Sequence, residues 1–169
     1  MTDDTSIDQI LATVRALPGA LVFEPREGDG TPEQAWGDAF CYYAPDGQVP
    51  GHVQPYATVV TKDYPGDTAS ALDAPGRLRV NVRVDRATFR ACTGEEPRAL
   101  ALPRDHTAVD VVLPHPVYGE LGWLCVVNPA ARTTDTLTEL LRAAHEAARA
   151  RVLRRAGGRG DGRNEGGDR

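Results

Sequence analysis

The chain has 169 residues, 24 of them acidic and 19 basic, so its formal net charge is −5. Its hydrophobic content of 41% is enough for one ordinary soluble core, and no disulfide or metal is needed for stability at this length. The composition excludes collagen, coiled coils and wholly disordered chains. No apolar run reaches the roughly 20 residues of a membrane span, and the acidic start is unlike a secretory signal, so we expect a cytoplasmic protein without membrane contact.

Two amphipathic helices are predicted near the ends of the chain. Apolar residues recur at helical spacing ahead of Pro18-Gly19, which predicts a helix at 6–17. Thr136 and Glu139 form a capping-box pattern before a second apolar stripe, which predicts a helix at 134–155. From residue 156 the chain is rich in Gly and its charges alternate in sign, so we expect a disordered tail over 156–169.

The middle of the chain is dominated by strand patterns. The clearest is 78–84, where Val80 and Val82 alternate with Asn81 and Arg83, which predicts one buried face and one wet face. Turn-forming Gly and Pro residues separate this segment from its neighbours. The predicted elements of the middle region are strands at 20–24, 38–44, 57–62 and 78–84, a short helix at 86–92, and strands at 109–113 and 121–127.

The order of these elements determines the expected fold class. Strands and helices do not alternate regularly, so a doubly wound parallel sheet is not expected. We predict an α+β fold, in which a mostly antiparallel sheet of five to six strands has the N- and C-terminal helices packed on one face. Residues 1–155 are expected to form a single domain.

The polar face of the 78–84 strand is a candidate nucleic-acid contact. Arg79, Asn81 and Arg83 would stand about 6.6 Å apart along it, close to the phosphate spacing of an extended strand. However, no aromatic residue is interleaved to stack bases, and the chain is acidic overall. Nucleic acid is therefore predicted to be an unlikely partner.

Cysteines and common motifs give no sign of a metal or cofactor. Cys41, Cys92 and Cys125 form no CxxC pair, so we expect reduced thiols. His145-Glu146 lacks the second histidine of an HExxH motif, and His145 is expected on the helix surface. P-loop, GxSxG and strand-linked GxGxxG patterns are absent from the sequence. We therefore predict no metal and no cofactor.

Polar and aromatic side chains at strand ends are the candidate ligand-binding residues. The only lysine, Lys62, follows a predicted strand next to Asp63 and could bind an anion or act as a nucleophile, although a surface ion pair is the commoner arrangement. A histidine and an acid beside aromatic residues could form a small-molecule pocket, although for each residue alone a capping or core role is the commoner one. The candidates are Trp36, Asp38, Lys62, Asp63, Asp67, His115, Tyr118 and Glu120, the last three near a predicted hairpin tip.

Four motifs give the chain a resemblance to a known family. They are Trp36-Gly37-Asp38, Tyr42–Gly47, Thr61–Asp67 and His115–Trp123. With them, residues 5–153 resemble an uncharacterised bacterial family, domain of unknown function 6194, whose name implies no activity. The layout also resembles the MmcQ/YjbR family, through Leu17-Pro18-Gly19, Arg79–Asp85 and the late Trp123. That second resemblance implies a double-wing α+β fold and suspected DNA binding.

Three functions remain open on the sequence. The first is a non-enzymatic binding module for a small molecule or a protein partner. The second is an enzyme of unrecognised class that uses Lys62, Asp63 or His115 in acid-base work. The third is a weak double-wing nucleic-acid binder. Whether the candidate side chains converge on one cavity discriminates between them.

Overall fold

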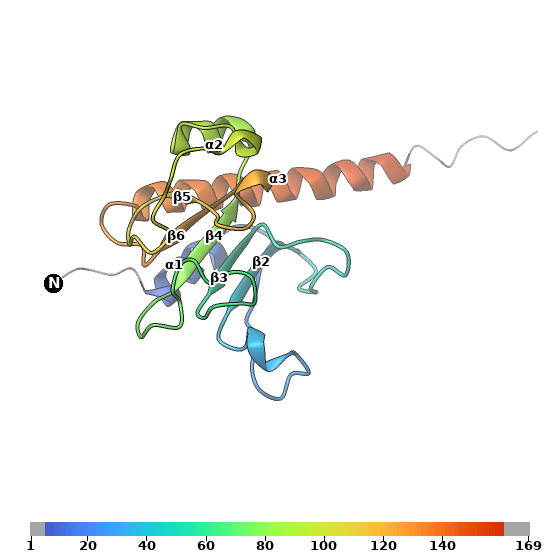
Figure 1. The fold of residues 1–169 in the computed structure, drawn as a ribbon. Coiled ribbons are helices and arrows are strands. Elements are labelled where there is room, and N and C mark those ends of the chain that lie inside the picture. The colour runs from blue at the N-terminus through green and yellow to red at the C-terminus, as the bar shows by residue number, and fades with distance from the viewer. Residues whose placement is uncertain (1–5, 161–169) are drawn as a thin grey trace, which may run out of the picture.

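The computed structural model describes residues 6–160 and has one antiparallel sheet at its centre (Figure 1). Its six strands lie in the order β1-β2-β3-β4-β6-β5. The predicted α+β class, with a mostly antiparallel sheet, is confirmed. The strands are β1 (Ala20–Phe23), β2 (Ala39–Tyr43), β3 (Ala57–Val60), β4 (Arg79–Arg83), β5 (Leu113–Pro114) and β6 (Trp123–Val127), and the helices are α1 (Ile7–Arg15), α2 (Arg86–Thr93) and α3 (Thr134–Gly160).

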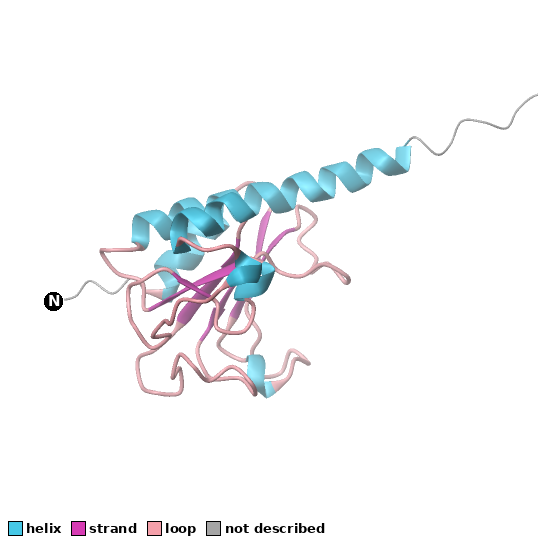
Figure 2. Ribbon diagram, turned by 45° about the horizontal axis from the view of Figure 1, so that its top comes forward, coloured by secondary structure: helices cyan, strands magenta, loops and turns pink. Residues whose placement is uncertain are grey.

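Helices α1 and α3 pack on the same face of the sheet, as predicted (Figure 2). The strands turn one set of alternate side chains toward the helices, and this set is apolar because it forms the core. α2 adds Phe89 at the side of β5. The buried core includes Leu11 and Val14 from α1, Cys41, Val59, Val82 and Leu124 from the sheet, and Leu137, Leu141 and Ala144 from α3.

The opposite face of the sheet carries a different set of side chains. Phe40 pairs with Thr58 across β2 and β3, and Thr58 pairs with Asn81 across β3 and β4. Residues directly opposite one another in antiparallel strands share a face, so these three point away from the helices. Arg79 and Arg83 lie on the same face by the alternation of β4. This helix-free surface is called the free face below.

His145 on α3 is buried, and the prediction that it lies on the surface is wrong. Its ring is 3% exposed and joins two parts of the fold. Nδ1 lies 3.0 Å from the hydroxyl of Tyr56, and Nε2 lies 2.8 Å from the carbonyl oxygen of Pro18. Since the carbonyl can only accept, Nε2 carries the proton and Nδ1 accepts from the tyrosine. His145 therefore connects α3 to the α1–β1 connection and to the residue that precedes β3.

The predicted strand at 109–113 is largely absent. Only Leu113 and Pro114 pair with β6, and Val109 forms an isolated parallel bridge to Val127. Asp110 interrupts the run because its backbone adopts the left-handed conformation, with φ of 56°. Asp is among the residues that tolerate this conformation, and the resulting bend directs the chain away from the sheet.

Asp110 also holds the start of α3. Its Oδ1 accepts hydrogen bonds from the backbone N–H of Ala130 (2.9 Å) and Thr133 (3.0 Å) and from the Thr133 hydroxyl (2.6 Å). Its Oδ2 accepts from the backbone N–H of Arg132 at 3.0 Å.

We expect Asp110→Ala to lower the free energy of unfolding by about 2–3 kcal/mol, because these donors lose a charged acceptor. Asp110→Asn, which keeps one carbonyl oxygen, should cost less; equal losses in urea unfolding would contradict this role.

α3 is longer than predicted and continues to Gly160. Each residue added to an existing helix closes one more i to i−4 hydrogen bond, whereas a glycine costs only about 1 kcal/mol of helix propensity. The start of the predicted disordered tail, 156–160, is thus helical, and the rest of that tail lies outside the described residues. Among residues 6–160, no helix combines the length and the hydropathy that a membrane span requires.

Candidate functional site

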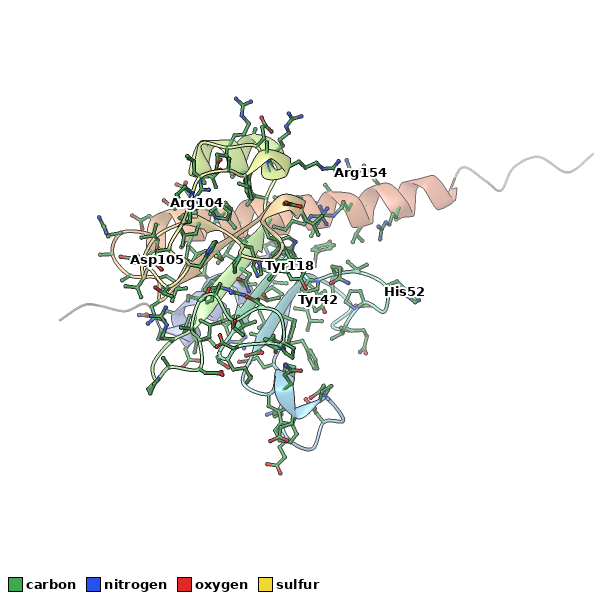
Figure 3. All side chains as sticks on the ribbon, in the orientation of Figure 1. Tyr42, His52, Arg104, Asp105, Tyr118 and Arg154 are labelled. Atoms are coloured by element: carbon green, nitrogen blue, oxygen red, sulfur yellow. The ribbon has the colours of Figure 1, made fainter. Side chains whose placement is uncertain are left out.

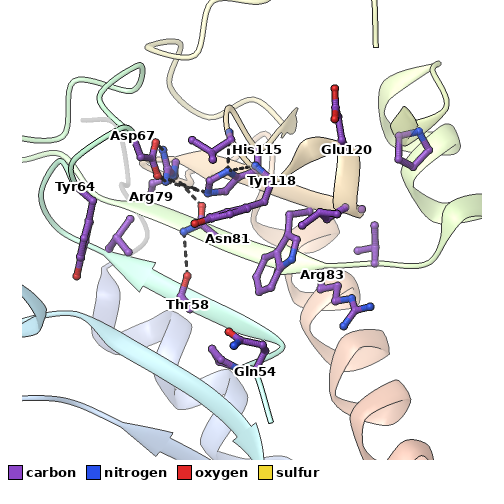
Figure 4. Close-up of a pocket in the computed structure, with 18 of the residues that line it drawn as sticks. Gln54, Thr58, Tyr64, Asp67, Arg79, Asn81, Arg83, His115, Tyr118 and Glu120 are labelled. Carbon is purple, nitrogen blue, oxygen red and sulfur yellow. Dashed lines mark hydrogen bonds and ion pairs between the residues drawn. The ribbon is translucent and has the colours of Figure 1, made fainter. Parts of the chain in front are cut away.

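A cavity of about 1560 Å³ lies over the free face of the sheet (Figure 4). Thr58 of β3 and Arg79 and Asn81 of β4 form its floor. The segment 64–67 and the β5–β6 loop stand over one part of this floor. Aromatic residues supply much of the remaining lining, among them Tyr42 on β2 next to the floor and Tyr118 in the β5–β6 loop (Figure 3). The aromatic residues that line the cavity are Phe40, Tyr42, Tyr64, Tyr118 and Trp123.

Arg79 organises the polar floor. It is 1% exposed, and each of its nitrogens donates hydrogen bonds. Nε donates to Oδ1 of Asn81 (2.8 Å), and Nη1 donates to the Ser70 hydroxyl (3.0 Å). Nη1 and Nη2 also donate hydrogen bonds to the two carboxylate oxygens of Asp67, at 2.9 and 2.5 Å. Because Nη2 additionally lies 3.0 Å from Nε2 of His115, one guanidinium positions groups from three segments of the chain.

The prediction that the 78–84 strand has a wet face is wrong for Arg79 and Asn81. Arg79 and Asn81 are buried, at 1% and 3% exposure, and Arg83 alone of the three is exposed. The cause is coverage by two distant segments, since Arg79 bonds to Asp67 on one of them and to His115 on the other. A buried guanidinium that already binds protein groups cannot contact a phosphate backbone. The predicted nucleic-acid row is therefore reduced to Arg83.

Asn81 connects Arg79 to the middle of the floor and is held in one orientation by it. Because Arg79 donates to its Oδ1, its Nδ2 must face β3, where it donates to the Thr58 hydroxyl at 3.0 Å. The Thr58 hydroxyl keeps its own hydrogen as a donor, and Nδ2 has a second hydrogen without a partner among residues 6–160. The floor therefore offers polar groups that can still bind a ligand.

His115 is held as a neutral imidazole. Its Nδ1 accepts hydrogen bonds from the backbone N–H groups of Val117 and Tyr118, both at 3.0 Å. Its Nε2 faces the guanidinium of Arg79 at 3.0 Å, and the nearest Asp67 oxygen is 3.8 Å away. Burial, together with the positive charge of Arg79, lowers the pKa of His115 to about 3. At neutral pH this side chain therefore carries no charge.

Asp67 remains ionised beside it. Burial alone would raise the pKa of Asp67, but the hydrogen bonds and charge of Arg79 hold that pKa below its ordinary value. The carboxylate and the guanidinium form an ion pair in which the arginine is 1% and the aspartate 15% exposed. This end of the cavity is therefore a buried charge pair next to a neutral histidine.

Asp38 and Lys62 form a separate cluster. The side chain of Asp38 has no exposed area, and its Oδ1 accepts from the backbone N–H of Thr61 (2.8 Å) and from Nζ of Lys62 (3.1 Å). Nζ also donates to the carbonyl oxygen of Trp36 at 2.7 Å. The Tyr64 hydroxyl donates to the other Asp38 oxygen, and burial together with this bond raises the pKa of Tyr64. This cluster joins the segment before β2 to the segment after β3.

The predicted ligand-binding residues therefore divide into two groups. Asp67, His115, Tyr118 and Glu120 line the cavity, whereas Trp36, Asp38, Lys62 and Asp63 are not among its described lining residues. Asp63 instead caps a turn, since its Oδ1 accepts from the backbone N–H of Leu72 at 2.8 Å. Tyr64 connects the two groups because it both lines the cavity and binds Asp38.

Comparison with known proteins gives a family for the chain. The sequence model of a family of unknown function, DUF6194, matches residues 5–157. The chain belongs to DUF6194. No curated protein matches it, and no solved structure matches it. Membership in DUF6194 names no activity, so the function has to be argued from the cavity.

The sequence did not single out every important residue of this DUF6194 site. Phe40 and Tyr42 stand at alternate positions of β2, on the side opposite the buried Cys41, and Thr58 follows on β3. Two aromatics spaced i, i+2 beside a core cysteine were a usable signal of an apolar free face. Within the described part of the DUF6194 chain, no three His, Cys, Asp or Glu side chains gather as a metal site.

Proposed function

We propose that the chain is a non-enzymatic binding module whose cavity holds a small organic molecule. The observation that carries the proposal is the composition of the cavity on the free face, where aromatic side chains of the sheet and the loops surround a group of ordered polar side chains. Small-molecule sites have this composition, because apolar walls supply most of the affinity and a few fixed polar groups set the orientation.

The size and order of the cavity support a small ligand. Typical ligand pockets measure about 300–1,000 Å³. The cavity of about 1560 Å³ has room for such a molecule and for water beside it. Its floor is held in place by the contacts of Arg79 with Asp67 and Asn81, so little ordering is required when a ligand binds.

The chemistry of the cavity favours binding over catalysis. A general base works best with a pKa near the operating pH, whereas the pKa of His115 is lowered to about 3 by burial and by Arg79. Lys62 is engaged by Asp38 and by the carbonyl oxygen of Trp36, outside the lining of the cavity. The alternative of an enzyme that uses these residues is therefore the weaker proposal.

A double-wing nucleic-acid binder is weaker still. The proposed relationship to the MmcQ/YjbR family would suggest DNA contacts on the sheet. Of the polar row on β4, however, only Arg83 is exposed. Counterion release from several phosphate contacts supplies most non-specific affinity, and the sheet offers only one such contact, so the rest would have to come from Arg151, Arg154 and Arg155 on α3.

We also propose a cytoplasmic location in a bacterium. Cys41, Cys92 and Cys125 are free, which suits a reducing compartment. Burial raises the pKa of the Cys41 and Cys125 thiols to about 12, so both remain protonated and unreactive at neutral pH.

The proposal is tested with the neutral apolar dye N-phenyl-1-naphthylamine, whose fluorescence rises in an apolar pocket. We expect saturable binding with one site per chain. Tyr42→Ala, which removes part of the aromatic wall, should weaken binding at least about fivefold, since base-sized aromatic contacts contribute about 1–3 kcal/mol. Leu153→Ala, at an exposed position on α3, is the control and should bind as the parent chain does. Absence of saturable binding, or equal affinity of the Tyr42 variant, would overturn the proposal.

A further inference from the structure

Arg83 lies at one end of the cavity, at the opposite end from Asp67 (Figure 4). It is the last residue of β4, and it pairs in register with Trp123 of β6. Its side chain is exposed, and within residues 6–160 it forms no ion pair or side-chain hydrogen bond. A cation without a partner is thus placed beside an indole ring inside the cavity.

The carboxylates that line the cavity do not neutralise Arg83. Asp67 is held by both terminal nitrogens of Arg79. Glu96 is paired with Arg86 at 2.5 Å and with Arg90 at 2.9 Å. Glu120 lies in the β5–β6 loop, and its carboxylate points away from Arg83 (Figure 4). The end of the cavity at Arg83 is therefore positive.

Helix α3 strengthens this positive field. Burial, followed by the positive charges of Arg83, Arg154 and Arg155, lowers the pKa of the Arg151 guanidinium. None of these four arginines takes part in an ion pair within the described residues. Like charges held together without a counterion cost free energy, and a bound anion relieves that cost.

We infer that the ligand of the cavity is a planar aromatic anion, whose acidic group binds Arg83 and whose ring lies against Trp123 and the neighbouring aromatic wall. This inference rests on the proposed binding function and adds the chemical class of the ligand. Arg83 makes the direct contact through its guanidinium, which suits carboxylate, sulfonate and phosphate groups alike. Arg151 acts indirectly, because its charge raises the positive potential around Arg83.

Two dyes that share an aromatic frame test the inference. The probe is the sulfonate 8-anilinonaphthalene-1-sulfonate, and the matched neutral probe is N-phenyl-1-naphthylamine. We expect Arg83→Gln to raise the Kd of the sulfonate about tenfold, because one charge-assisted contact is lost, and to leave the Kd of the neutral dye within about twofold. Arg151→Gln should raise the sulfonate Kd about threefold. Added NaCl should weaken the sulfonate alone.

Arg142→Gln is the matched control, because Arg142 is exposed on the same helix, nine residues or about two and a half turns before Arg151. It should change neither affinity. If Arg83→Gln weakens both dyes equally, or neither of them, the anion inference is overturned while the binding function stands. If the parent chain binds neither dye, the binding function itself fails. Circular dichroism and unfolding midpoints establish that each variant is folded.

Discussion

Acidification from pH 6.5 toward pH 3 should destabilise the fold by about 1.4 kcal/mol per pH unit through His115 alone. The pKa of His115 is about 3 in the folded chain, lowered from the ordinary value of 6.5. Between these two values the unfolded chain binds a proton that the folded chain does not bind. The contribution of His115 to the free energy of unfolding is therefore fully present above pH 6.5 and is lost as the pH drops toward 3.

The loss has a direct structural origin. The neutral ring already carries its one hydrogen on Nε2, because Nδ1 accepts hydrogen bonds, so an added proton has to go to Nδ1 and would face two donors there. Nδ1 is occupied by the backbone N–H groups of Val117 and Tyr118, and Nε2 faces Arg79. The loss over the whole window is on the order of 5 kcal/mol, a large part of the roughly 5–15 kcal/mol by which domains of this size are stable.

Urea unfolding followed by circular dichroism at several pH values between 4 and 7.5 measures this slope. His115→Asn is the informative variant, because an amide oxygen can accept the two backbone N–H groups and does not titrate. Its slope should be smaller by about one proton. His52→Asn is the matched control, since His52 is exposed on the β2–β3 loop (Figure 3). If the His115 variant keeps the slope of the parent chain, His115 is not the group responsible.

Arg79→Met should produce the second large effect, a loss of about 3–5 kcal/mol in the free energy of unfolding at pH 7. Methionine fills much of the same volume but donates no hydrogen bond. The substitution leaves the carboxylate of Asp67 without its partner and removes the donor that orients Asn81. Removal of one member of a buried ion pair is costly because the other charge stays desolvated.

The double variant Arg79→Met/Asp67→Asn distinguishes this cause from poor packing. Without the stranded charge, part of the loss should be recovered, so the double variant should be more stable than Arg79→Met alone. Arg15→Met is the control, because the ion pair of Arg15 with Glu24 is about half exposed on both sides, at 47% and 49%. Urea midpoints should show almost no change for it. A double variant less stable than the Arg79 single variant would contradict the explanation.

The sequence predicted the sheet and helices because their patterns are local. Alternation in β4 and helical spacing in α1 are imposed by the core that each element faces, and the two helices lie on the predicted face. The prediction of a strand at 109–113 was wrong because the left-handed backbone conformation of Asp110 redirects the chain. Its carboxylate acts on residues some 20 positions later, which no local window contains.

The site was predictable only in part. His115, Asp67 and Tyr118 were recognised by residue type and do line the cavity. The burial of Arg79 and Asn81 was missed, because periodicity within one strand shows that a face is polar but not that distant loops cover it. Lys62 and Asp38 were grouped with the cavity because they are charged and stand at strand ends. Their contacts depend on how the chain folds around β2 and β3.

The edge of the sheet at β5 has a consequence for self-association. β5 contains two residues and pairs only with β6, and its second residue is Pro114. Proline has no backbone N–H to offer an approaching strand, and a two-residue edge presents almost no ladder to extend. The chain is therefore protected at this edge against strand-to-strand aggregation, without any charged residue placed there for the purpose.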